Sequence, residues 1–186
     1  MNSNEYYLKI RNHYEKQWGN ISETQCWDKG PVNELPQEFQ VLVFKPNSTR
    51  EMWTYATCGM SKIIDEHPFE LHIFAPERND SLVELLTVIA HYHRIGSSLG
   101  LGHTINFGRP WLPESKCEYG LISLPYLDGP SLEWLDTDDT KIRFLWLIPI
   151  TKKEVEYKKK YGLDALEERF DNEMFNYLEP QRMSMV

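Results

Sequence analysis

The segment Lys141-Ile-Arg-Phe-Leu-Trp-Leu-Ile-Pro-Ile150 is strongly apolar, and this pattern predicts a central strand of a sheet as far as Pro149. Directly after it, Thr151 and Glu154 have the spacing of a capping box, in which two residues cap each other across the first turn of a helix. The helix that begins there is expected to end at Gly162. A buried strand that runs into a capped helix indicates a fold in which helices pack against a sheet.

Further strands are expected from runs of β-branched and aromatic residues that end near Gly or Pro. Short connections join the first three of them, so an antiparallel meander is their simplest pairing. The third alternates strictly, with Phe69, Leu71 and Ile73 on one face, which predicts a half-buried strand. In chain order, the expected strands cover Phe39–Phe44, Glu51–Cys58, Phe69–Phe74, His103–Phe107 and Tyr119–Tyr126.

Helices are expected where apolar residues recur at helical spacing. The longest begins at Ser81, which has capping-box spacing to Glu84, and glycines mark its end. In the last helix, Asp164 is the expected N-cap, and the chain after Pro180 is expected to fray. Strands and helices in this order indicate an α+β fold. The expected helices cover Ser3–Trp18, Ser81–Leu99, Thr151–Gly162 and Asp164–Leu178.

The composition is that of a globular domain, and we expect residues 1–186 to form one domain. Hydrophobic residues make up 41% and charged residues 26% of the chain, which is ordinary globular usage. The net charge of −8 disfavours direct binding of nucleic acid, because neutralising phosphates needs a basic surface. The same charge fits a protein partner with a basic surface, although solubility alone is a simpler reason for an acidic chain.

The cysteines and the N-terminal residues bear on where the chain works. Cys26, Cys58 and Cys117 are odd in number and widely spaced, which disfavours a disulfide framework and a zinc site and suits a reducing cytosol. The first residues lack the basic start and apolar run of a signal peptide. No apolar stretch approaches the length of a membrane span. We therefore expect a cytoplasmic protein without a membrane partner.

The sequence contains no pattern that is typical of a catalytic, metal or cofactor site. His91 and His93 are two residues apart on an expected helix and point to different faces, so they cannot form the i, i+4 metal pair of a metalloprotease. The glycine-rich run Gly96–Gly102 follows a helix, whereas a phosphate-binding loop precedes one. We therefore expect no enzyme activity, no metal and no cofactor.

Cys58, at the end of an expected strand, leaves one enzymatic alternative open. A cysteine nucleophile needs a histidine close in space, and His67 or His72 could supply it. A buried structural cysteine is the favoured interpretation, because free cysteine is among the most buried residue types.

The clearest charge feature is a run of acidic residues between Gly129 and Thr140, a segment without Lys or Arg. The simpler interpretation is a solvated loop before the apolar strand, with its tryptophan packed in the core. The sharper interpretation is an acidic surface with an aromatic anchor for a basic partner. The residues of this acidic stretch are Glu133, Trp134, Asp136, Asp138 and Asp139.

The chain resembles the suppressor-of-fused-like domain family in five segments, which follow the order of the family and together span about Phe39 to Phe170. The first resembles the family's strand into a Thr-x-Gly-Met/Leu-Ser turn, and the last resembles its apolar strand into a capped helix. The most similar members are stand-alone bacterial antitoxins. The segments are Trp53-Thr-Tyr-Ala-Thr-Cys-Gly-Met-Ser61, Phe69-Glu-Leu-His-Ile-Phe74, Asn106-Phe-Gly-Arg-Pro-Trp111, Tyr119-Gly-Leu-Ile-Ser-Leu-Pro125 and Phe144-Leu-Trp-Leu-Ile-Pro-Ile-Thr-Lys-Lys-Glu154.

The resemblance implies an α/β sandwich around a mixed, largely antiparallel sheet that is flanked by helices. It also implies a protein-binding domain rather than an enzyme. Bacterial members are associated with polymorphic toxin systems as immunity proteins, which bind and neutralise a cognate toxin, often a nuclease. Animal members bind a transcription-factor peptide as an extended strand, a mode called β-augmentation.

These observations lead to three hypotheses about function. The first is an immunity protein or antitoxin that covers a toxin with a basic surface through the acidic stretch. The second is a general peptide-binding module that takes an extended segment on a sheet edge. The third is a cysteine-dependent enzyme that uses Cys58.

Overall fold

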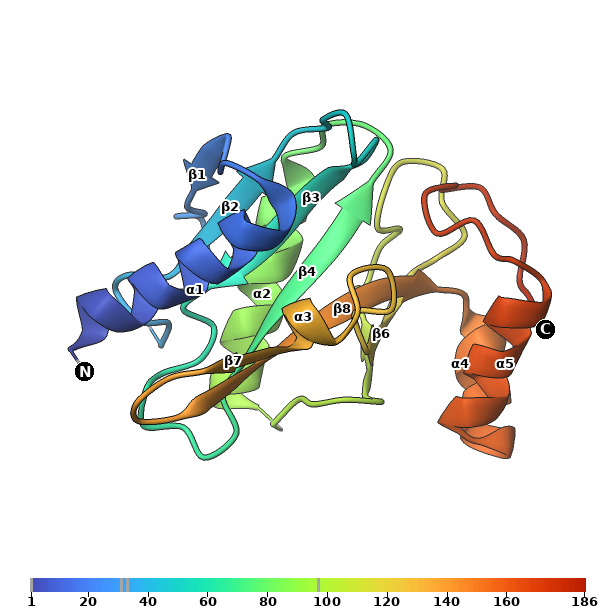
Figure 1. Ribbon diagram of the computed structural model, residues 1–186. Helices are drawn as coiled ribbons and strands as arrows, with labels where there is room; N and C mark the ends of the chain where they lie inside the picture. Colours follow the sequence, from blue (N-terminus) through green and yellow to red (C-terminus); the bar gives the residue numbers. More distant parts are fainter. Residues whose placement is uncertain (1, 31, 33, 97) are drawn as a thin grey trace.

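The computed structural model describes residues 2–30, 32, 34–96 and 98–186. A mixed eight-stranded sheet carries helices on both faces, which is the α+β sandwich expected for the chain (Figure 1). The strands are β1 (Glu23–Gln25), β2 (Gln40–Phe44), β3 (Trp53–Cys58), β4 (Phe69–Ala75), β5 (Thr104–Asn106), β6 (Tyr119–Ser123), β7 (Trp134–Asp136) and β8 (Lys141–Ile150). The helices are α1 (Ser3–Trp18), α2 (Ser81–Ile95), α3 (Pro130–Glu133), α4 (Lys152–Tyr161) and α5 (Leu163–Asn172).

The sheet is built around β8, the strand of the apolar segment. The order across the sheet is β1-β2-β3-β4-β8-β6-β5, and β7 also pairs with β8. β4 runs parallel to β8, and the other strand pairs of the described residues are antiparallel. The expected meander of β2, β3 and β4 and the central place of β8 are therefore confirmed.

The side of β8 that faces away from β4 is shared by two strands. β6 pairs with residues 146–150 of β8, and β7 pairs with residues 141–143. Residues 124–133 leave the sheet between them and carry α3. β6 and β7 are therefore two halves of one antiparallel partner, and the excursion between them brings Tyr126 and Leu127 close to Trp146 of β8.

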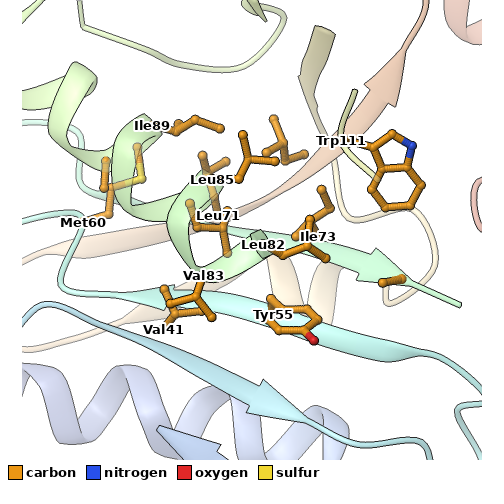
Figure 2. Close-up of a cluster of buried hydrophobic side chains, with 14 of the residues drawn as sticks. Val41, Tyr55, Met60, Leu71, Ile73, Leu82, Val83, Leu85, Ile89 and Trp111 are labelled. Carbon is orange, nitrogen blue, oxygen red and sulfur yellow. The ribbon is translucent and has the colours of Figure 1, made fainter. Parts of the chain in front are cut away.

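Both faces of the sheet are covered by packed apolar side chains. On one face, Leu82, Leu85 and Ile89 of α2 belong to the same buried cluster as Leu71 and Ile73 of β4 (Figure 2). On the other face, α1 packs over part of the sheet, and α4, α5 and the C-terminal residues pack over another part. Two layers of helices thus enclose the sheet (Figure 1). In the strand order, β5 is the last strand on one side.

The expectation of a half-buried β4 is wrong, because both faces of this strand are covered. Every residue from Phe69 to Ala75 is buried. On the face toward α1, the ring of Trp18 lies 5.2 Å from the ring of His72, centroid to centroid. The alternating residues of β4 therefore lie on two faces that are both buried. One face is apolar, and the other includes polar side chains, which can be buried where tertiary contacts accommodate them.

Glu70 shows how a charged residue is accommodated inside β4. Its carboxylate accepts hydrogen bonds from the Thr57 hydroxyl and from the backbone N–H groups of Gly59, Met60 and Ser61, at 2.6–3.2 Å. Burial raises the pKa of Glu70 to about 7, and these donors act against that rise. The donors come from the end of β3 and the turn after it, so Glu70 holds this turn against β4.

The boundaries of α2 differ from those expected. The helix ends at Ile95 instead of Leu99, because the backbone leaves the helical conformation at Gly96. Ser81 does not cap the helix, and its backbone N–H donates to the Asn79 side chain at 3.0 Å. Asn79 therefore satisfies one backbone N–H at the start of α2, and the Ser81–Glu84 spacing marks no capping box.

The C-terminal helices show one expected cap and one that is wrong. The capping box of Thr151 and Glu154 is confirmed in both directions. Asp164 makes no capping hydrogen bond, and α5 ends at Asn172 instead of Leu178, after which Met174 adopts a φ of 44°. In the described residues, no helix combines the length and the apolar character that crossing a bilayer requires.

The residues after Pro180 are packed, which corrects the expectation of a frayed tail. Arg182 is buried and donates to both oxygens of Glu154, at 2.6 and 2.9 Å, and to the carbonyl of Pro149 at 2.9 Å. The backbone N–H of Met185 also donates to Glu154, at 3.0 Å. A buried carboxylate is costly without a partner, so this ion pair ties the tail to the start of α4.

Candidate functional site

A groove of about 640 Å³ runs along the free edge of β5, and we call it the β5 groove. β5 is the last strand of the sheet on its side, so the groove lies beside an unpaired edge. α2 lines it with Val88 and Tyr92, which are 49% and 46% exposed and leave apolar surface uncovered. α4 lines it with Lys158 and Lys159, and burial, followed by the charge of Lys159, lowers the pKa of Lys158.

The backbone of β5 has hydrogen-bonding groups directed into this groove. Toward β6, the N–H of Phe107 donates and the carbonyl of His103 accepts. Hydrogen bonding alternates along an antiparallel pair, so the backbone groups of Thr104 and Asn106 point away from β6. Both residues line the β5 groove. An exposed edge of this kind can accept a further strand.

Two glycines fix the path of the chain around this edge. A Cβ at Gly120 of β6 would lie 2.6 Å from the Phe107 ring and from the Leu147 side chain, so only glycine lets that ring lie across the strand. Gly102, just before β5, has a φ of +80°, a conformation that favours glycine. The shape of the edge is therefore encoded locally at these two positions.

A second groove, of about 610 Å³, lies between α5 and the excursion that follows β6, and we call it the α5 groove. On the side of the excursion, Tyr126 and Leu127 are 55% and 45% exposed. The more buried lining residues form an apolar floor, and they are Trp146, Ile148, Phe170, Phe175 and Tyr177. The acidic side chains that α5 contributes are Asp164, Glu167, Glu168 and Asp171.

These α5 carboxylates give the groove a negative charge. Ser123 and Tyr126 donate hydroxyl hydrogen bonds to the two oxygens of Glu167, at 2.7 and 3.0 Å. Burial and then the Glu167 carboxylate raise the pKa of Tyr126 to about 12, and the charges of Asp171 and Asp164 act in the same direction. No ion pair among the described residues includes a carboxylate of α5.

The excursion that carries Tyr126 and Leu127 is anchored to the rest of the molecule at Asp128. Its carboxylate accepts a hydrogen bond from the indole N–H of Trp18 at 2.9 Å and forms an ion pair with Arg50. The Arg50 guanidinium lies 5.1 Å from the centroid of the Trp18 ring. These contacts hold one wall of the α5 groove in place.

The acidic stretch lies elsewhere, along α3, β7 and the turn into β8, and it meets cations there. The charge of Asp139 also reaches a cation, because it adds to the rise in the pKa of Lys9 that the hydrogen bond to Asp138 causes first. The acidic stretch is therefore largely compensated. Its ion pairs are Glu133–Arg143 at 2.7 Å, Asp136–Lys141 at 3.4 Å and Asp138–Lys9 at 3.0 Å.

Trp134 of the acidic stretch is a surface residue with cations on its ring. It is 37% exposed, which overturns the interpretation that places it in the core. The charged groups of Lys141 and Arg143 each lie 4.8 Å from its ring centroid. Trp134 also lines a third groove, of about 410 Å³, together with Glu66 and His67. The contact of this stretch with a partner stays a prediction.

A family model described as suppressor of fused protein (SUFU) matches residues 36–183. The chain belongs to the SUFU family. A solved SUFU homolog from Neisseria gonorrhoeae FA 1090 is 33% identical to it, with a TM-score of 0.84. That match covers 98% of this chain and 97% of the homolog, and it confirms the family resemblance.

Two more distant solved structures share the SUFU fold. The crystal structure of the Sufu–Fu complex contains a chain that is 17% identical, with a TM-score of 0.71 and coverage of 97% of this chain and 92% of that one. Drosophila Suppressor of Fused is 16% identical, with a TM-score of 0.72. The match covers 97% of this chain but 51% of the Drosophila chain, so this chain spans about half of it. A search of curated proteins found no match.

In this SUFU family member, Cys58 does not have the environment of a cysteine nucleophile. Cys58 is buried and donates to the Tyr7 carbonyl at 3.7 Å, and burial, followed by the charge of Glu70, raises the pKa of its thiol. A cysteine nucleophile needs a lowered pKa. His67 is exposed, and burial lowers the pKa of His72 to about 3. Within the described ranges, no group of His, Cys, Asp and Glu side chains could hold a metal ion.

Neither the β5 groove nor the α5 groove was predicted from the sequence, for different reasons. Asp164, Glu167, Glu168 and Asp171 recur at i, i+3, i+4 and i+7, so the acidic face of α5 has a signal in the sequence. The free edge at Thr104–Asn106 has no such signal, because pairing on one side or on both is decided by the rest of the sheet.

Proposed function

We propose that this chain is a non-catalytic protein-binding domain that takes an extended segment of a partner protein on the free edge of β5. The observation that carries the proposal is the outward direction of the backbone groups of Thr104 and Asn106 inside a largely apolar groove. A strand added there continues the sheet by β-augmentation. The Sufu–Fu complex supports a protein partner, since a relative with this fold is solved in it.

The walls of the β5 groove define the chemistry of the segment. Side chains of an added strand point alternately to the two faces of the sheet. On the face of α2 they meet Val88 and Tyr92, which favour apolar residues. Toward α4 they meet Lys158 and Lys159, which favour acidic or polar residues. The partner segment is therefore extended and carries apolar residues at alternate positions.

We further propose that the partner is a toxin and that the chain acts as an immunity protein, or antitoxin, in the cytoplasm. The net charge of −8 supports a partner with a basic surface, such as a nuclease. The free thiols of Cys26, Cys58 and Cys117 fit a reducing compartment. Residues 1–186 act as one domain in this proposal, and they cover the surface of the toxin stoichiometrically, without a cofactor.

The acidic stretch is the contact proposed for the basic surface of the toxin. Its exposed members include Trp134, Asp136 and Asp138. Asp136→Lys together with Asp138→Lys is expected to weaken protection against the toxin and to reduce the dependence of binding on salt. Protection that stays at the wild-type level would remove this placement and leave the β5 groove as the contact.

The binding mode is tested by co-purification with the product of the adjacent gene, using two substitutions at one position. Thr104→Pro removes the outward N–H, whereas Thr104→Ala keeps it and serves as the matched control. Val88→Glu adds a charge to the apolar wall at an exposed position of α2. Thr104→Pro and Val88→Glu are each expected to weaken binding about tenfold or more, and Thr104→Ala is expected to change it little.

The results separate the binding mode from the role. If Thr104→Pro binds the partner as tightly as Thr104→Ala, strand addition on β5 is wrong. If the adjacent gene's product binds but does not harm cells that lack this chain, the protein-binding proposal stands and the immunity role is wrong.

A further inference from the structure

We propose that the α5 groove binds an arginine-containing basic segment of a protein, as a site separate from the β5 groove. The inference rests on the proposed function in one respect, namely that the natural occupant belongs to a protein partner. The arginine side chains would lie on the apolar floor and direct their guanidinium groups to the carboxylates of α5. Each part of this arrangement has a separate basis in the structure.

Charge is the first basis. The four α5 acidic residues that line the groove form no ion pair with any residue in the described part of the chain. Glu167 and Asp171 are spaced by four on the helix, as are Asp164 and Glu168, so like charges are neighbours. A cation bound between them relieves this repulsion, which a neutral or acidic occupant cannot do.

An unsatisfied donor in the floor is the second basis. Trp146 is 3% exposed and lines the groove, and its indole N–H has no hydrogen-bond partner among the residues described. Buried polar groups are nearly always hydrogen-bonded, so such a donor needs an explanation. The N–H is covered in the structure, so a peptide carbonyl accepts from it when a bound segment displaces a neighbouring side chain of the floor, which a simple cation would not do.

The floor also explains why arginine is favoured over lysine. Trp146 packs against Tyr177 at 5.2 Å between ring centroids, and Phe175 stacks on Phe170 at 4.4 Å. A planar guanidinium stacks on aromatic rings and pairs with a carboxylate through two hydrogen bonds, whereas an ammonium group is a hydrated point charge. The volume of about 610 Å³ is large enough for more than one side chain of a segment.

The groove is held in shape before anything binds. Two hydroxyls position the Glu167 carboxylate, and Asp128 anchors the excursion opposite α5 through Trp18 and Arg50. A binding site that is already ordered loses less entropy when it is filled. The structure thus combines fixed walls, an apolar floor, unpaired carboxylates and an unpaired donor in one place.

The test uses the whole chain and a fluorescein-labelled hexa-arginine peptide with blocked ends, followed by fluorescence anisotropy at fixed ionic strength. Glu168→Gln with Asp171→Asn removes two exposed carboxylates of the groove. Glu34→Gln with Glu77→Gln removes two exposed carboxylates that line none of the three grooves above, and it is the matched control for net charge. We expect about a tenfold weaker affinity for the first pair and less than about a twofold change for the control.

A second measurement reports on the floor directly. In ¹⁵N-labelled protein, the indole N–H signal of Trp146, assigned by its loss in Trp146→Phe, is expected to shift as hexa-arginine is added. Equal weakening in both variant pairs would show attraction by net charge alone and would overturn the site. Absence of binding, or a Trp146 signal that does not move while binding occurs, would overturn it as well.

The outcome is independent of the test of the β5 groove, because hexa-arginine binding is measured without the partner protein. A failure here leaves strand addition on β5 untouched. A failure of the co-purification experiment likewise leaves the hexa-arginine result to stand on its own.

Discussion

The acidic stretch around β7 and the acidic face of α5 carry similar numbers of carboxylates but have different surroundings. At β7, Glu133 pairs with Arg143, and the aspartates of the turn meet Lys141 and Lys9. On α5, no carboxylate has a cation partner in the described residues. Acidic residues that pair with cations of the same chain stabilise the fold. Acidic residues without such partners leave a negative electrostatic potential that attracts a cationic ligand.

The difference follows from what the fold places opposite each segment. The antiparallel pairing of β7 with β8 sets Asp136 beside Lys141 and Trp134 beside Arg143, and α1 brings Lys9 to the turn. The groove side of α5 faces Tyr126, Leu127 and aromatic rings instead. We expect the stabilising effect of a carboxylate to depend on whether it has a cation partner and on how deeply the pair is buried.

The largest change in stability is expected at the most buried ion pair, Glu154 with Arg182. Arg182→Met leaves the Glu154 carboxylate buried without its cation and should reduce the free energy of unfolding by about 3–5 kcal/mol. Urea denaturation measures the loss, and hydrogen exchange should show faster exchange at Met185. The double variant with Glu154→Met and Arg182→Met should lose less free energy of unfolding than Arg182→Met alone. A larger loss in the double variant would contradict this explanation.

A smaller effect is expected at Glu133, whose side chain is 16% exposed beside Arg143 at 28%. Glu133→Gln leaves a partly buried guanidinium with a weaker partner and should cost ~1–3 kcal/mol. Asp136→Asn is the matched control in the same stretch, since its side chain is 77% exposed, and it should cost less than ~0.5 kcal/mol. Equal losses in the two variants would show that burial does not decide the effect.

On α5 the effect should change sign. Asp171→Asn removes one of two like charges spaced by four, at Glu167 and Asp171, and should raise the free energy of unfolding by ~0.2–0.5 kcal/mol. Thermal and urea denaturation of Asp171→Asn beside Asp136→Asn measure the contrast. A lower stability of Asp171→Asn would mean that a cation of the chain pairs with the acidic face of α5. The acidic stretch and α5 would then no longer differ.

The smallest change in stability is expected at Asp138. Its ion pair with Lys9 should be detected more clearly by the pKa of Asp138 than by the free energy of unfolding. The hydrogen bond from Lys9, and then its charge, hold the pKa of Asp138 below its ordinary value. Such a carboxyl group favours the folded state above its unfolded pKa, and this contribution disappears as the pH falls through the folded pKa. In Lys9→Met, NMR titration should find the pKa of Asp138 higher than in the wild type. Lys16→Met, on the same helix, should leave it unchanged.

Much of the fold is predictable from local patterns. The apolar run at Lys141–Ile150 places β8 in the centre of the sheet, and the stripe of Tyr6, Ile10 and Tyr14 predicts α1, whose bounds are confirmed. These predictions hold because burial follows the periodicity of helices and strands. The expectation for β4 is wrong because periodicity cannot reveal that Trp18 covers the side chain of His72.

The candidate sites show the same limit. The acidic stretch looks uncompensated in the sequence, because its partners Lys9, Lys141 and Arg143 lie outside it. The tail after Pro180 looks free for the same reason, since Arg182 meets a carboxylate of a preceding helix. The free edge of β5 is visible only when the strand order is known.

The sequence by itself determined the class of fold, the central strand, the family and the negative charge, since each depends on neighbouring residues or on composition. Tertiary structure alone decided which carboxylates are paired, which edge is free and which groove keeps an unpaired charge. The physical reason is range: helix and strand patterns repeat within a few residues, whereas electrostatic pairing depends on distance in space and decays over about 10 Å at ordinary salt. Lys9 and Asp138 are far apart in the chain and 3.0 Å apart in the fold.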